Sequence, residues 1–93
     1  MKNNTIKVTT SSGFKCEIDP NVSNDWRLLR AISKCQHEET AFEGGIELES
    51  ILLKDKGSKA LEAHLEALDG YVDAEKLFSD LSEIIQSLST SKN

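Results

Sequence analysis

The sequence has few of the residues that mark disulfide-rich, turn-rich or membrane-spanning proteins. Two cysteines, one proline and five glycines among 93 residues are too few for a disulfide framework or a turn-rich all-β fold. No apolar run approaches the roughly 20 residues that a membrane-spanning helix needs. The first ten residues are polar and lack the apolar core of a signal peptide. We therefore expect a cytoplasmic, mainly helical protein with reduced cysteines.

Basic residues are in the minority, since 11 Lys and Arg stand against 16 Asp and Glu, for a formal net charge of -5. This charge repels nucleic-acid phosphates and anionic lipid surfaces. The lysines are interleaved with carboxylates and apolar residues, so they form no basic stripe. A chain of this length buries one modest core, which predicts a single domain over residues 1–93. The expected partner is another protein, with no nucleic acid and no membrane.

Residues 6–18 predict an N-terminal β-hairpin. Apolar and polar residues alternate in 6–9 and again in 14–18, and Ser11-Ser12-Gly13 between them has the composition of a turn. In this pairing one face is apolar, and it comprises Ile6, Val8, Phe14, Cys16 and Ile18. A two-stranded ribbon is only marginally stable alone, so this face is expected to pack on helices.

Residues 20–88 predict about four helices in a small bundle, which makes the fold class mainly α with a β-hairpin (α+β). The first helix is expected to start at Asp19-Pro20 or a few residues later, and to end between Lys34 and His37. Its apolar stripe predicts Trp26 and Leu29 as buried structural anchors. Residues 36–45 lose the helical period, and their glycine pair predicts a long loop.

The second and third helices are predicted to be short. Helical periodicity resumes at Ile46 and is expected to stop near Lys54. Asp55 or Ser58 can cap a third helix, in which Leu61 and Leu65 are predicted structural anchors. Asp69-Gly70 is expected to end this helix.

The fourth helix has the clearest pattern. Asp73 is its predicted N-cap, because Val72 and Leu77 flank it at the spacing of a hydrophobic staple. A seam of apolar residues follows, and it comprises Leu77, Leu81, Ile84, Ile85 and Leu88. The seam can either complete the core or bind a partner, and we take it as the candidate partner-binding or self-associating surface. Residues 89–93 are polar and are expected to form a flexible tail.

No group of residues has the spacing of a catalytic or metal-binding motif. Cys16, Cys35, His37 and His64 are zinc-ligand types, but the paired CxxC and HxxxH spacings are absent. Acidic residues in 38–49 lack the alternating ligands and loop glycine of an EF-hand. We therefore expect no catalytic residue, no metal and no cofactor, and we interpret the protein as a non-enzymatic binding protein.

Several segments resemble one known family. They are Phe14-Lys-Cys-Glu-Ile-Asp19, Asn24-Asp-Trp-Arg-Leu-Leu29, Ile51-Leu-Leu53, Ala60-Leu-Glu-Ala-His-Leu65 and Asp69-Gly-Tyr-Val72. In this order, over roughly residues 14–88, the chain resembles the tail assembly chaperones of long-tailed, siphovirus-type phages and prophages of Gram-positive bacteria. It departs from their pattern at Gly57-Ser58 and in the Phe-Glu-Gly-Gly segment that ends at Gly45.

The resemblance implies a chaperone that binds the tape measure protein, a long helical chain, and keeps it soluble during tail morphogenesis. Such a protein acts in the host bacterial cytoplasm and is not part of the mature virion. Contacts with other tail components and a small homo-oligomer are compatible with it. The alternative is a small acidic helical adaptor or antitoxin-like regulator that binds one globular protein partner.

Overall fold

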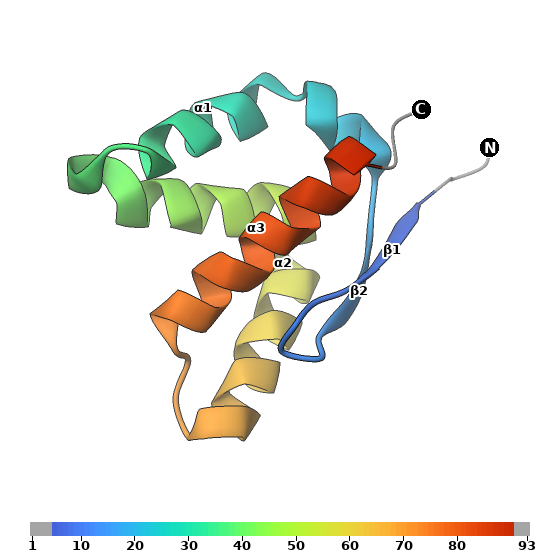
Figure 1. Ribbon diagram of the computed structural model, residues 1–93, viewed down its shortest axis with the longest axis vertical. Coiled ribbons are helices and arrows are strands. Elements are labelled where there is room, and N and C mark those ends of the chain that lie inside the picture. The colour runs from blue at the N-terminus through green and yellow to red at the C-terminus, as the bar shows by residue number, and fades with distance from the viewer. Residues whose placement is uncertain (1–4, 91–93) are drawn as a thin grey trace.

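The computed structural model describes residues 5–90. Strands β1 (Ile6–Thr9) and β2 (Lys15–Ile18) are followed by α1 (Trp26–Cys35), α2 (Ala41–Asp69) and α3 (Ala74–Thr90). Two short 3₁₀ helices, η1 (Pro20–Asn24) and η2 (Glu38–Thr40), precede α1 and α2. The mainly helical fold with an N-terminal hairpin is therefore confirmed (Figure 1). Residues 5–90 contain three α-helices, so the prediction of about four is wrong.

The hairpin is antiparallel and docks through its turn. Ile6 pairs with Ile18, and Gly13 takes a positive φ of 93° that favours glycine. In the turn, the Thr10 and Ser12 hydroxyls donate to the buried Asp80 carboxylate of α3, at 2.8 and 2.5 Å. The hairpin is thus tied to the last helix of the chain.

The glycine pair lies inside α2, so the loop predicted over residues 36–45 is wrong beyond residue 40. A Cβ on Gly44 would lie 2.8 Å from both the Ala31 carbonyl oxygen and the Cys35 backbone nitrogen. A Cβ on Gly45 would collide with the ring of Phe78. Both glycines are buried, and their missing side chains let α1 and α3 pack closely on α2. Tertiary packing therefore overrides the low helix propensity of glycine.

A sharp bend divides α2 at Lys54, whose φ of 62° and ψ of -177° are not helical. Figure 1 shows the two parts of α2 running in different directions. The second and third predicted helices therefore lie on either side of this bend and follow one another without a loop. Beyond the bend, the Ser58 hydroxyl donates to the Glu49 carbonyl oxygen at 3.3 Å. Gly57 lies on the inside of the bend, where a Cβ would be 2.9 Å from the Leu53 Cβ.

The hydrophobic core joins the hairpin to all three α-helices. Its buried members are Val8, Phe14, Ile18, Leu28, Ala31, Leu48, Leu52, Leu53, Leu61, Leu65, Leu81, Ile84 and Leu88. Leu61 and Leu65 are fully buried. Trp26 is 70% exposed and Leu29 is 48% exposed, so their prediction as buried anchors is wrong. Because α1 begins only at Trp26, its buried face is set by Leu28 and Ala31 instead.

Helix α3 begins after Asp73, whose carboxylate accepts a hydrogen bond from the Lys76 backbone nitrogen at 3.0 Å. The helix continues to Thr90, so the first two residues of the predicted 89–93 tail are helical. The rest of that tail, residues 91–93, lies outside the described residues. None of the helices in residues 5–90 is both long and apolar enough to cross a membrane.

Candidate partner-binding groove

Helices α1 and α3 both pack on α2 (Figure 1). Side chains of α1 and α3 together line a groove. It consists of two hollows, of about 280 and 180 Å³, which share Ile32 of α1 and Ile85 of α3. The apolar residues that line it are Leu28, Leu29, Ile32, Leu48, Phe78, Ile85 and Leu88. The polar residues and the cysteine are Ser23, Cys35, Gln36, Ser82, Gln86 and Ser89. The two hollows are thus adjacent, and Leu48 is the lining residue contributed by α2.

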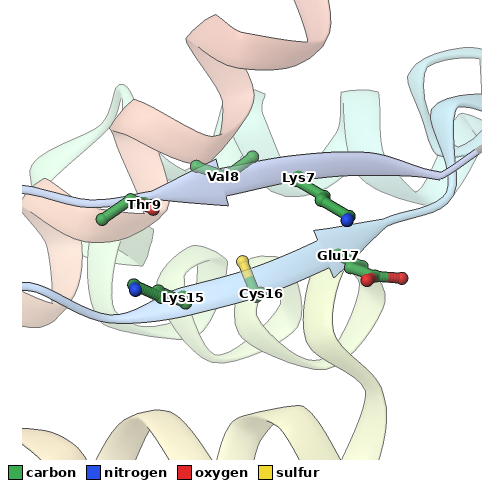
Figure 2. Close-up of a pocket in the computed structure, with 6 residues that line it drawn as sticks. All are labelled: Lys7, Val8, Thr9, Lys15, Cys16 and Glu17. Carbon is green, nitrogen blue, oxygen red and sulfur yellow. The ribbon is translucent and has the colours of Figure 1, made fainter.

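The described residues that line this groove include no Asp, Glu, Lys or Arg. The contrast with the whole chain is large, because 11 basic and 16 acidic residues make up 29% of the sequence. A hollow along the hairpin is lined by Lys7, Lys15 and Glu17 together with uncharged residues (Figure 2). Another, between the hairpin turn and α3, includes Lys76 and Asp80. Lack of charge therefore distinguishes the groove between α1 and α3 from these two hollows.

Exposed apolar side chains extend the groove at both ends. Trp26, Leu29 and Ile32 are three residues apart on α1, so they form one continuous stripe on the helix surface. At the other end, Phe42 is 72% exposed, and its ring centroid lies 6.2 Å from that of Phe78. Large apolar side chains that gather on a surface mark interaction sites more often than scattered ones do.

The structure divides the seam predicted on α3. Leu81, Ile84 and Leu88 are buried in the core, and Leu77 packs against that core. Of the five seam residues, Ile85 and Leu88 line the groove, and Ile85 is the more exposed of the two. The seam as a whole is therefore not a partner-facing surface, which corrects that prediction.

The exposed side of α3 was missed from the sequence because it is rich in serine and glutamine. Phe78, Ser82, Ile85 and Ser89 follow one another at intervals of four, three and four residues. This spacing puts them on one face of the helix. On α1, the matching signal was the three-residue repeat from Trp26 to Ile32, which was interpreted as a core stripe.

The two cysteines are poor nucleophiles in this fold. Burial raises the pKa of the Cys35 thiol, and the nearby Glu47 carboxylate raises it further. Burial and then Asp80 raise the pKa of Cys16 in the same way. A thiolate is therefore scarce at neutral pH.

The histidines and acidic residues do not assemble a metal centre within residues 5–90. Over this part of the chain no three His, Cys, Asp or Glu side chains are grouped so that they could hold a metal ion. The His64 Nε2 atom lies 2.8 Å from the Ser12 carbonyl oxygen, so this ring helps to hold the hairpin turn against α2. His37 is the exposed residue that precedes η2.

Besides Asp80, a second buried carboxyl group lies outside the groove, close to the bend of α2. Glu49 is 7% exposed, and its Oε2 atom has no hydrogen-bond partner in the structure. Burial raises its pKa to about 7, with a further contribution from the Glu62 carboxyl beyond the bend. Near neutral pH the Glu49 carboxyl group is therefore protonated in part of the population.

The chain was compared with protein-family models, curated proteins and solved structures, and none of these comparisons gave a match.

Proposed function

We propose that this protein is a phage tail assembly chaperone that binds the tape measure protein through the groove between α1 and α3. The observation that carries the proposal is the uncharged groove with exposed apolar side chains at both ends. The resemblance of residues 14–88 to such chaperones supports the same function. In this role the protein acts in the host bacterial cytoplasm and is absent from the mature virion.

The length of the groove along α3 suits a short α-helix. Its wall on α3 runs from Phe78 to Ser89, which is about 16 Å of helix rise, or about three turns. An amphipathic helix placed there would bury its apolar stripe against Ile32, Leu48 and Ile85. Proteins that bind helices commonly present such a groove to residues at i, i+3, i+4 and i+7. A long helical protein offers many segments of this kind.

In the proposed function the protein covers apolar surface of its partner and catalyses no reaction. Trp26 and Phe42 are large and exposed, and aromatic side chains of this kind contribute much of the binding energy at protein interfaces. The groove is open to solvent, which suits a partner that binds and is later released. No bond is made or broken in this proposal, so it requires no catalytic residue and no cofactor.

The test is co-expression with the long helical protein encoded downstream, measuring how much of that protein stays soluble and whether the two co-purify. The groove variant is Ser82→Arg, which places a charge on an exposed position of the groove wall. Its matched control is Ser79→Arg, also exposed on α3 but lining the hollow beside the hairpin turn.

We expect the wild type and the Ser79→Arg variant to keep the partner soluble and to elute with it. The Ser82→Arg variant should lose both properties while its circular dichroism spectrum stays that of the wild type. A partner whose solubility does not depend on the wild-type protein contradicts the proposal. Stable capture of a compact globular protein in its place favours the adaptor or regulator described above.

A further inference from the structure

The polar side chains that line the groove are uncharged. Gln36, near the C-terminal end of α1, and Gln86 on α3 line the same hollow, together with the hydroxyl of Ser82. These side chains donate and accept hydrogen bonds, but they carry no charge. A charged group docked between the walls would lose water and find no counter-ion among the described lining residues.

The geometry points to a specific partner chemistry: a helix of about three turns whose apolar stripe is flanked by Ser, Thr, Asn or Gln and not by Lys, Arg, Asp or Glu. This inference rests on the proposed function and deepens it, since it states which segments of a long helical partner are bound. Segments with charged flanks stay hydrated and are left uncovered.

The hydrogen-bonding groups of the walls give the positive part of this selection. Neutral flanking side chains can exchange their bonds to water for bonds to Gln36, Gln86 and Ser82. A lysine or glutamate at the same place is held near Ile32 and Ile85, which offer no polar atoms. Selection therefore comes from the penalty on charged flanks as much as from the bonds to neutral ones.

Three designed peptides of equal length and helicity test the inference on the full-length protein. They share one apolar stripe, and their flanks carry Gln and Ser, Lys, or Glu. The dissociation constant of each is measured by fluorescence anisotropy at low and at high salt. We expect the neutral peptide to bind at least about tenfold more tightly than either charged one. Its affinity should change less than about twofold with salt, because no ion pair is formed.

A variant that adds a charge to the groove wall shows whether the selection arises there. Gln86→Lys changes an exposed position, and it should improve binding of the Glu-flanked peptide about tenfold while weakening that of the Lys-flanked peptide. Ser79→Lys is the matched control, since it adds the same charge on α3 outside the groove.

Three results would overturn the inference. They are equal or tighter binding of a charged peptide to the wild type, an unchanged preference in the Gln86→Lys variant, and no binding of any peptide. The proposed function is judged separately by co-expression with the long partner. If that partner is kept soluble while the peptides fail, the chaperone function stands and the neutral-flank selection does not.

Discussion

Replacing Glu49 with Gln should stabilise the protein at about pH 8 and leave its stability at about pH 4 nearly unchanged. Glu49 is buried beside the bend of α2, and its Oε2 atom lacks a hydrogen-bond partner. Burial and the Glu62 carboxyl raise its pKa from 4.5 to about 7 in the folded protein. Glutamine keeps the shape of the side chain and cannot ionise.

The sign follows from proton binding. Between pH 4.5 and about 7 the folded protein holds a proton on Glu49 that the unfolded chain has lost. The free energy of unfolding therefore decreases as the pH rises through this window, and it levels off above it. The full shift corresponds to about 3 kcal/mol. Because Glu62 is exposed, solvent screens the repulsion between the carboxylates, and we expect about half of that value.

Urea unfolding followed by far-ultraviolet circular dichroism measures this effect in the wild type and the Glu49→Gln variant at both pH values. The quantity of interest is the difference between the two proteins, which removes other groups that titrate. Glu66→Gln, at an exposed position of the same helix, is the control and should change stability by less than about 0.5 kcal/mol at either pH. The argument fails if the difference between wild type and Glu49→Gln is the same at both pH values.

Three further substitutions test the packing by the same urea unfolding. Gly44→Ala should lower the free energy of unfolding by about 1 to 2 kcal/mol, because the clash of its Cβ with the α1 backbone costs more than the higher helix propensity of alanine gains. An unchanged stability would contradict the close approach of the two helices. Asp80→Ala should cost about 2 kcal/mol and speed amide exchange in the hairpin turn, since the Thr10 and Ser12 hydroxyls lose their acceptor; unchanged exchange would argue against this anchoring. Trp26→Ser should change stability by less than about 0.5 kcal/mol, and a loss above about 1.5 kcal/mol would refute its surface position.

The hairpin and the capped final helix were predictable because their signals are local. Alternation on both sides of a glycine-containing turn specifies a hairpin whatever lies around it. Asp73 caps α3 through a bond to a backbone nitrogen three residues later, which sequence spacing reveals directly. The burial of Leu61 and Leu65 likewise follows from a strong period on one helix.

The glycine pair misled the prediction because its effect depends on contacts between helices. Glycine lowers the stability of an isolated helix, so a local argument places Gly44 and Gly45 in a loop. In the folded protein, Ala31 and Phe78 occupy the space that side chains at these positions would take. Nothing in the sequence near residue 44 reports that two other helices cross there. The end of a helix near Lys54 was predicted, but the sequence did not show that the next helix follows without a loop.

The burial of most of the predicted seam could not be read from the sequence for a related reason. An apolar seam can be read from a sequence, but the sequence does not tell whether the fold itself covers it. Leu81 and Ile84 are buried in the hydrophobic core, so only the other side of α3 is available to a partner. That side carries Phe78 and Ile85 among serines and glutamines, and it faces the stripe of α1 across the groove. The weaker pattern is therefore the one left exposed on the surface, and it is there that we place the proposed groove.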